Sequence, residues 1–368
     1  MNKDSAMATT TAAVLTARER FARCFDRRDL ERCPIFDQPW GATLERWRRE
    51  GLPESTPYWD YFGLDRIASF GIDNSPQWPV ETIEETAEYR IHRTAWGATL
   101  KDWTHHGGVP EFLDFRLKSP ADWVEAKSRI GTGDERIPWE LLRREWPQWQ
   151  KDGAWIEAGL WFGFDVTHSW MVGTERVLNA LIEEPEWLVD MWQTQLETQL
   201  TLLDRVLAAG FHFDAIRWPD DMGFMGKQFF SRRTYQRLLQ PVHRRAVEWA
   251  HFHGIKAVLH SCGDIRPLVG DIVAIGIDML NPIEVKAGMD PAALKRDHGD
   301  RLAFHGGLNA ALFGRMDELI AEVDRIVPVL MAGGGYVVAS DHSVPDSVSL
   351  ADFGRFVAHA KKVATYGG

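Results

Sequence analysis

The sequence has no run of about 20 uninterrupted apolar residues, the length that a transmembrane helix needs. Its beginning, MNKDSAMATTTAAVLTARERF, lacks the continuous apolar segment of a signal peptide and is expected to be a loose tail that leads into a helix. The only cysteines are Cys24, Cys33 and Cys262, too few for a disulfide framework. We therefore expect a cytoplasmic protein without a membrane span.

Basic residues are in the minority, with 42 Lys and Arg against 53 Asp and Glu and a formal net charge of −11. Such a charge repels phosphate-rich partners, so we expect no nucleic-acid binding. Hydrophobic residues make up 45% and charged residues 26%, which is typical of a folded globular chain. The chain has 17 tryptophans, none of them after Trp249. They either fill a bulky core or line an aromatic pocket, and composition does not separate the two.

From about residue 211 onward, short apolar runs alternate with amphipathic helices, and each repeat has the size of a parallel βαβ crossover. The runs are FDAIRWP, IKAVLH, IDMLN, LAFH and GYVVAS. Helices are predicted over Ser231–His253, Ile265–Ile275, a short segment from Asp290, Met316–Met331 and Ala351–Ala364. Earlier strands are predicted near Ile35, Ala68 and Ala158, and a helix over Glu186–Ala209 follows the third of them.

Five later strands and three earlier ones make eight, the number in a (β/α)8 (TIM) barrel. Alternating residues between Thr82 and Phe115 predict a β-ribbon inserted on that barrel. We expect an α/β fold with an N-terminal tail and helix over residues 1–30 and a single barrel domain over residues 31–368, with an insertion around 80–150. An open, doubly wound sheet is the alternative, because the first three strands are less clearly marked.

Polar residues follow most of the predicted strands, at the end where α/β barrels place their active sites. In strand order they are Asp37, then Asp165 and His168, then Asp220 and Asp221, then His260 and Cys262, then Glu284, then His305 and Asn309, then Asp341 and His342. Each could cap a helix, but their recurrence indicates an active site. Adjacent residues at a strand end cannot both point into the pocket, so we favour one of Asp220 and Asp221 as an acid–base group.

The segment VLHSCGD is the most specific motif. His260 and Cys262 are two residues apart on one strand, so their side chains point the same way. An imidazole and a thiolate at a barrel mouth are ligands that zinc prefers. The structural alternative is that Cys262 packs as a small hydrophobe while His260 bonds a carboxylate. Further ligands would come from another strand end, with His342 as the first candidate, followed by Glu284, His305 and Asp341.

Four motifs together resemble the uroporphyrinogen decarboxylase superfamily: HSCGD, DDMG followed by an S-x-R-x-Y-x-x-L-x-x-P helix, FHGGLN, and GGGYVVASDHSVPDSV. The resemblance covers roughly Pro34 to Ala364 and is most specific from Asp220 to Pro345. It implies an α/β barrel that is usually homodimeric. Members include true uroporphyrinogen decarboxylases and zinc-dependent, corrinoid-linked methyltransferases such as the coenzyme M methyltransferases.

The methyltransferases of this superfamily use a His-x-Cys pair and a later cysteine. His260 and Cys262 match the pair, but His342 stands where the cysteine falls, and true decarboxylases also have histidine there, for the substrate. The arginine-rich substrate motif of true decarboxylases is absent, and Asp37 and Trp40 stand in its place. A porphyrinogen, with its many carboxylates, needs paired arginines. The resemblance is therefore closer to the methyltransferase branch.

We expect a zinc-dependent methyltransferase or demethylase that moves a methyl group between a small methylated or methoxylated compound and a thiol or corrinoid carrier. No cobalamin-binding domain is recognisable, so any corrinoid would come on a partner protein. The predicted residues are His260, Cys262 and His342 for zinc, Asp220, Asp221, Glu284 and Asp341 for catalysis, and Asp37, Trp40, His168, Trp218, His305 and Asn309 for the substrate. The alternatives are a metal-independent decarboxylase or lyase of a small organic acid, with Asp221 and His342 as acid–base groups, and a ligand-binding protein without activity.

Overall fold

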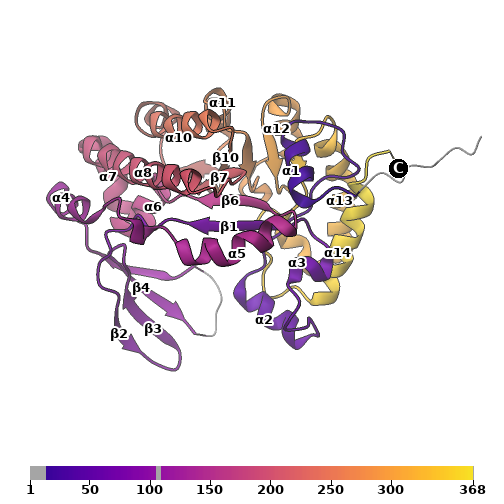
Figure 1. Ribbon diagram of the computed structural model, residues 1–368, viewed down its shortest axis with the longest axis horizontal. Coiled ribbons are helices and arrows are strands. Elements are labelled where there is room, and N and C mark those ends of the chain that lie inside the picture. Colours follow the sequence, from indigo (N-terminus) through magenta and orange to yellow (C-terminus); the bar gives the residue numbers. More distant parts are fainter. Residues whose placement is uncertain (1–13, 105–108, 368) are drawn as a thin grey trace, which may run out of the picture.

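A parallel sheet forms the centre of the computed structural model, which describes residues 14–104 and 109–367. The sheet has seven strands in the order β1-β6-β7-β10-β11-β12-β13. They are β1 (Ile67–Gly71), β6 (Trp155–Gly159), β7 (Ala215–Pro219), β10 (Lys256–His260), β11 (Met279–Asn281), β12 (Ala303–His305) and β13 (Tyr336–Val337). In Figure 1 the strands β1, β6, β7 and β10 lie side by side, with α8 (Pro185–Ala208) and α10 (Gln240–Phe252) above them and α5 (Trp139–Lys151) below. This arrangement confirms the predicted α/β class.

The first predicted strand, near Ile35, forms only isolated parallel bridges. Ile35 pairs with Val338 and Pro39 pairs with Val344. On its other side, the backbone N of Asp65, two residues before β1, donates to the backbone O of Ile35 at 2.9 Å. The segment thus lies between the two edge strands, where an eighth strand would lie. Closure into an eight-stranded barrel stays a prediction.

The inner face of the sheet has an apolar floor. Alternate strand residues point inward, and those nearest the strands' N-terminal ends form one buried cluster: Trp155, Ala215, Val258, Met279, Ala303 and Val337. Helix α1 (Ala17–Phe25) contributes to the same cluster, with the rings of Phe21 and Phe25 stacked on Trp155 at 5.6 and 5.3 Å. The N-terminal end of the sheet is therefore filled, which leaves the carboxyl ends for chemistry.

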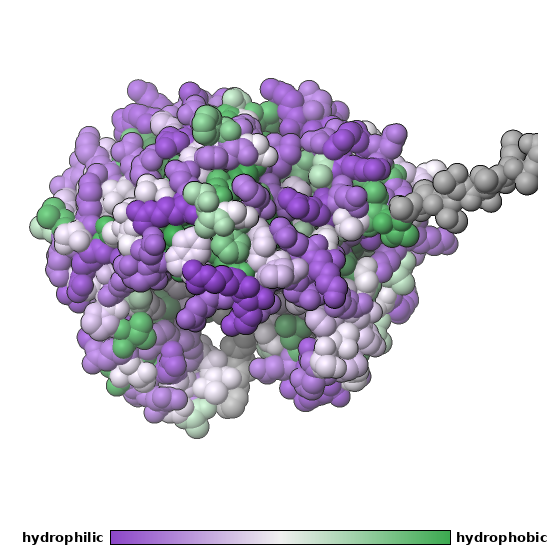
Figure 2. Space-filling model, viewed as in Figure 1, coloured by the Kyte–Doolittle hydropathy of each residue, from purple (hydrophilic) through white to green (hydrophobic). Residues whose placement is uncertain are grey.

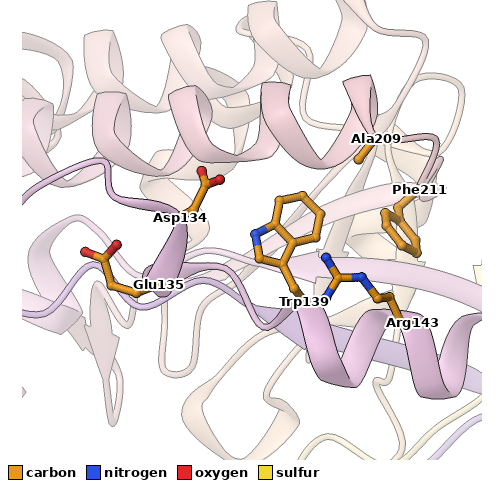
Figure 3. Close-up of a pocket in the computed structure, with 6 residues that line it drawn as sticks. All are labelled: Asp134, Glu135, Trp139, Arg143, Ala209 and Phe211. Atoms are coloured by element: carbon orange, nitrogen blue, oxygen red, sulfur yellow. The ribbon is translucent and has the colours of Figure 1, made fainter.

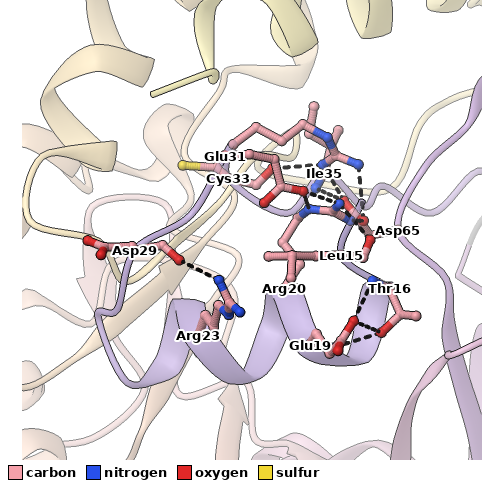
Figure 4. A network of polar contacts seen from close by, with 11 residues as sticks. Leu15, Thr16, Glu19, Arg20, Arg23, Asp29, Glu31, Cys33, Ile35 and Asp65 are labelled. Carbon is pink, nitrogen blue, oxygen red and sulfur yellow. Dashed lines mark hydrogen bonds and ion pairs between the residues drawn. The ribbon is translucent and has the colours of Figure 1, made fainter. Parts of the chain in front are cut away.

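A network of ion pairs joins α1 to the segment around residues 31–35 and to the residue Asp65 that precedes β1 (Figure 4). The guanidinium of Arg20 pairs with Glu31 and Asp65, and Arg32 Nη1 donates to Asp65 Oδ2 at 2.6 Å. The same oxygen accepts the backbone N of Ile35 at 2.8 Å. Because Asp65 is buried, removal of its charge would leave two guanidinium groups without their partner.

The helices predicted in the second half are present, with boundaries shifted by at most about a residue or two. They are α8 (Pro185–Ala208), α11 (Arg266–Ala274), α12 (Pro291–His298), α13 (Met316–Met331) and α14 (Leu350–Val363). The helix predicted over Ser231–His253 is divided into α9 (Arg232–Thr234), a π-helical turn η3 (Tyr235–Leu239) and α10 (Gln240–Phe252). Pro241 has no N–H to donate to the preceding turn, which accounts for the irregular hydrogen bonding.

The remaining helices lie mostly in the first half: α2 (Gly41–Arg49), α3 (Tyr58–Phe62), α4 (Pro120–Arg129), α5 (Trp139–Lys151), α6 (Phe164–Val166) and α7 (Thr174–Glu183). Short turns are η1 (Asp134–Arg136), the π-helical η2 (Thr167–Met171), η4 (Val285–Ala287) and η5 (Ala310–Gly314). None of the helices in the described residues has both the length and the apolar character needed to cross a membrane.

An antiparallel sheet follows the carboxyl end of β1, where the β-ribbon was predicted. Its strands are β2 (Glu81–Glu85), β3 (Tyr89–Arg93), β4 (Ala98–Trp103) and β5 (Glu111–Phe115). The ring of Phe112 lies 6.4 Å from that of Trp170 in η2. The surface is hollowed between this sheet and the α2 region (Figure 2). The predicted division at residues 30 and 31 and the insertion limits of 80–150 remain predictions.

Candidate metal centre

Three side chains with metal-binding atoms converge at the carboxyl ends of the neighbouring strands β7 and β10. Ligand atoms of Asp221, His260 and Cys262 all lie within 4.8 Å of one another. Cys262 Sγ is 3.4 Å from His260 Nε2, which is 3.7 Å from Asp221 Oδ1. The side chains of His260 and Asp221 are 32% and 35% exposed, so solvent and small molecules reach the group.

The ring of His260 is oriented by Asn281, its register partner on β11. Asn281 Oδ1 accepts from Arg217 Nη1 at 3.3 Å, and Asn281 Nδ2 donates to the backbone O of His305 at 3.1 Å. With the amide oriented in this way, Oδ1 also accepts a hydrogen bond from His260 Nδ1, 2.7 Å away. The Nε2 lone pair then faces Cys262 and Asp221, the orientation that outer partners give to metal-binding histidines.

The Cys262 thiol is in surroundings that oppose its ionisation. Burial is the largest cause that raises its pKa, and the negative charges of Asp221, Glu284 and Asp165 raise it further. A bound cation would remove this penalty, because it stabilises the thiolate and the nearby carboxylates together. Nitrogen, sulfur and oxygen donors from three residues match the donor set of a zinc site that keeps a position open.

The loop that carries Cys262 is packed directly on a hairpin formed by β8 (Gly223–Phe224) and β9 (Lys227–Gln228). Gly263 has φ +80°, and a Cβ there would lie 2.0 Å from the backbone C of Gly223. Its backbone N donates to Glu284 Oε2 at 2.6 Å. The glycine of the HSCGD motif is therefore required by backbone contact, and Glu284 holds this loop in place.

The two adjacent aspartates point in different directions, as expected for neighbouring residues at a strand end. Asp221 faces the metal-binding group, whereas Asp220 is fully buried, with Oδ2 2.8 Å from His243 Nε2. Its Oδ1 accepts the backbone N of Asp165 at 2.8 Å. Burial raises the pKa of Asp220. This position suits a structural role better than the catalytic role predicted for Asp220.

His342, the third zinc ligand favoured by the sequence, lies outside the converging group and has its ring 6.1 Å from that of Trp40. The reason is the path of the loop after β13. The backbone O of Val344 accepts from the backbone N of Trp40 at 3.1 Å, and Ser340 is hydrogen-bonded to Asp37. The structure therefore brings Asp221, and not His342, to His260 and Cys262.

Other predicted residues near the loop after β13 accept hydrogen bonds from backbone N–H groups of the protein itself. Asp37 Oδ2 accepts the backbone N of Ser340 at 2.8 Å, and burial raises the pKa of Asp37 to about 6. Asp341, whose pKa burial also raises, accepts the backbone N of Val285 at 2.9 Å and of Ala310 at 2.8 Å. Asn309 caps η5. These contacts connect loops and argue against free catalytic or substrate-binding groups.

Two other predicted substrate residues are enclosed. Trp218 lies on the helix-facing side of β7, fully buried, with its ring 5.5 Å from Phe162 and 5.6 Å from His243. It cannot line the mouth, because alternation directs it outward from the sheet. His305 Nε2 donates to the backbone O of Phe36 at 3.1 Å, and burial lowers the pKa of His305 to about 3. His305 is therefore a neutral residue enclosed on the inner face of the sheet.

His168 lies on η2, after the carboxyl end of β6, and beside it is Asp165, which the sequence marked only as a polar strand-end residue. His168 Nε2 is 3.4 Å from Asp165 Oδ1. Burial is the largest cause that raises the pKa of Asp221, and the negative charge of Asp165 raises it further. Asn281 was missed entirely. Its position after IDML was visible in the sequence, but its pairing with His260 depends on strand register.

One surface pocket lies apart from these residues. A pocket of about 640 Å³ is lined by Asp134, Glu135, Trp139, Arg143, Ala209 and Phe211 (Figure 3). Its side chains come from η1, the start of α5 and the chain after α8. None of the predicted site residues lines it, so it has no place in the candidate centre.

A curled parallel sheet with converging polar groups at its carboxyl ends defines an α/β protein with barrel-like architecture. A family model described as uroporphyrinogen decarboxylase (URO-D) matches residues 166–363, which is more than half of the chain. The protein belongs to this family, and the resemblance seen in its motifs is confirmed. No curated protein gives a significant match.

Among solved structures, a methyltransferase from Methanosarcina mazei is similar over 95% of this chain and 99% of its own, with a TM-score of 0.64 and 14% identity. At this identity the likeness shows the fold. A Penicillium canescens endo-1,4-beta-xylanase, XylE, covers 61% of this chain and 78% of its own at 11% identity, and its TM-score of 0.33 supports no argument.

Proposed function

We propose that this protein is a zinc-dependent methyltransferase or demethylase of the URO-D family. It would transfer a methyl group between a small methylated or methoxylated compound and a thiol or corrinoid carrier. The observation that carries the proposal is the convergence of Asp221, His260 and Cys262, with Nε2 of His260 directed at the other two. The extended structural likeness to a methyltransferase supports it.

In this proposal His260 Nε2, Cys262 Sγ and one oxygen of Asp221 hold the zinc ion. Zinc with an open position supplies Lewis-acid chemistry to a thiol or oxygen of a reactant. Asn281 keeps the proton of His260 on Nδ1, and Glu284 fixes the Gly263 backbone beside Cys262. A corrinoid would be brought by a partner protein, and the homodimer and the closed eight-stranded barrel belong to the same proposal.

The family description favours a second candidate, a metal-independent decarboxylase of a small organic acid. A porphyrinogen is a poor fit, because Arg217 at the mouth is already paired with Glu157, with Nη2 to Oε1 at 3.2 Å. Asp221 would then act as an acid–base group. The two candidates differ in whether the protein needs a metal.

The test is zinc content, measured on protein purified without chelator and reloaded with zinc. We expect about one zinc per chain in the wild type and in His342→Ala, and little in Asp221→Asn. Asp346→Asn, in the same loop as His342, is the matched control and should keep its zinc. A wild-type protein that never binds zinc, yet releases CO2 from a small acid, would establish the decarboxylase instead.

A further inference from the structure

Asp165 and His168 lie beside the candidate metal centre, although no ligand role falls to them. They follow β6, with His168 on the π-helical turn η2, and such turns are frequent at functional sites. The backbone N of Asp165 is hydrogen-bonded to Asp220, the neighbour of Asp221. The charge of Asp165 acts on both Asp221 and Cys262. The pair therefore borders the metal-binding group.

One oxygen of Asp165 is held and the other is available. Oδ1 accepts from Ser169 Oγ at 3.1 Å and lies 3.4 Å from His168 Nε2. On the other side of the imidazole, Nδ1 is 3.1 Å from Thr174 Oγ1. In the described part of the chain no hydrogen bond reaches Asp165 Oδ2, and the side chain is 15% exposed. Asp165 thus presents one carboxylate oxygen while His168 stays behind the other.

The other acidic groups around the centre are engaged. Asp220 is paired with buried His243, and Glu284 holds Gly263 and lies 3.5 Å from Lys286 Nζ. Asp264 is paired with Arg266 at 2.7 Å, and Asp341 accepts two backbone N–H groups. Among the described residues, Asp165 is the carboxylate near the centre that can exchange a proton with a reactant.

The surroundings also hold the pair in position. The ring of His168 packs on Phe164 at 4.5 Å and on Phe229 at 5.5 Å. Beneath Asp165, Asp220 is bonded to His243, whose Nδ1 is 3.2 Å from the Tyr235 hydroxyl. Tyr235 begins the second π-helical turn, η3. Both irregular turns therefore support the same strand end.

Resting on the proposed function with a thiol as acceptor, we propose that the Asp165–His168 pair takes the proton of the thiol and returns it to the leaving group. For a methoxylated donor, the S–H proton passes to Asp165 Oδ2. The sulfur then forms a bond to the methyl carbon as the C–O bond breaks. The electron pair of the C–O bond stays on the oxygen. The pair protonates that oxygen, so a methyl ether and a thiol give an alcohol and a methyl thioether, with no other reactant.

The experiment counts protons. The zinc-loaded full chain and the metal-free chain are titrated with 2-mercaptoethanol at pH 7 by calorimetry in phosphate and in Tris, whose different ionisation heats give the protons released. We expect wild-type protein to release well under one proton per thiol bound and Asp165→Asn to release about one. His168→Gln should fall between them. Asp324→Asn, which breaks a remote pair with His359 at 2.7 Å, is the matched control.

Turnover should fall by about 100-fold or more in Asp165→Asn, the usual size of an acid–base contribution. Its zinc content should equal that of the wild type, which shows that the centre is intact. Equal proton release by wild type and Asp165→Asn, or no thiol binding at all, would overturn the inference. If the protein binds zinc but wild type and Asp165→Asn release equal numbers of protons, only the proton role of Asp165 is refuted. If the wild type retains the thiol proton but the chain binds no zinc, only the proposed function is refuted.

Discussion

At the carboxyl ends of β7 and β10, the potential metal-ligand atoms of Asp221, His260 and Cys262 converge. The side chains of His260 and Asp221 are about one-third exposed. On the side of the loop after β13, the carboxylates of Asp37 and Asp341 are buried and accept hydrogen bonds from neighbouring loops. Both sides read alike in the sequence, as polar residues after strands. They differ in how many of their acceptor oxygens the protein itself uses.

The comparison teaches that a strand-end carboxylate becomes a structural group when backbone N–H groups occupy its oxygens. Such a carboxylate accepts hydrogen bonds from buried backbone N–H groups that have no other acceptor. Its removal leaves those N–H groups unpaired. A carboxylate with an available oxygen costs little to remove but can bind a cation or a proton. Substitutions on the two sides should therefore affect different measurements.

The largest effect is expected on the β7–β10 side. Cys262→Ser should weaken zinc binding by more than about 100-fold, because a hydroxyl is a far weaker zinc ligand than a thiolate. Loss of a residue that only hydrogen-bonds to a metal ligand already lowers metal affinity by about 10–100-fold. Zinc content after dialysis measures this. Cys33→Ala removes a buried thiol away from the centre and should keep the metal. A zinc-replete Cys262→Ser protein would remove the basis of the comparison.

Next in size is a pH effect at Asp37. Its pKa is raised to about 6, so the folded protein binds that proton more tightly than the unfolded chain does. Stability from this group is highest below about pH 4 and falls as pH rises through about 6. Between pH 4 and pH 7, the unfolding free energy of Asp37→Asn should gain about 2 kcal/mol relative to wild type. Denaturant titrations at each pH would show a constant difference if Asp37 were exposed.

Asp341→Asn should cost about 1–3 kcal/mol of stability, because an amide cannot accept both backbone N–H groups of Val285 and Ala310 in the same geometry. Zinc content should be unchanged. Urea unfolding of this variant beside exposed Asp346→Asn isolates the effect. If Asp341→Asn lost zinc without losing stability, the two sides of the mouth would share one function.

The smallest effect concerns Asn281, which sharpens the assignment of His260. Asn281→Leu should weaken zinc binding by about tenfold, because Nδ1 of His260 loses the acceptor that fixes its tautomer. Asn281→Asp keeps an acceptor at that position and should retain zinc better. Competition with a zinc-sensitive dye gives both affinities. Equal affinities in the two variants would show that His260 does not depend on this contact.

Much of the fold could be predicted because local signals were strong. Helix α13 has the predicted limits, Met316–Met331, and ends at the glycine triplet 333–335, whose φ values are +70°, +78° and +71°. The π-helical turn before Pro241 was not predicted, since it depends on how one missing N–H is accommodated. The segment near Ile35 has strand-like residues but forms only isolated bridges.

The site was less predictable, because it depends on contacts between distant segments. Strand alternation was enough to place His260 and Cys262 on the same side. The choice between Asp221 and His342 as the next donor depends on the loop after β13, which Asp37 holds through Ser340. The role of Asn281 depends on the register of β10 and β11. No local pattern contains either relation.

The bare backbone contact between Gly263 and Gly223 has a mechanical consequence. With no side chain between them, a shift of the Cys262 loop cannot be absorbed by rotamer changes and must move the β8–β9 hairpin as well. That hairpin carries Phe224 and Met225, which are 42% and 66% exposed. A small displacement of the Cys262 loop should therefore also move these two exposed side chains on the protein surface.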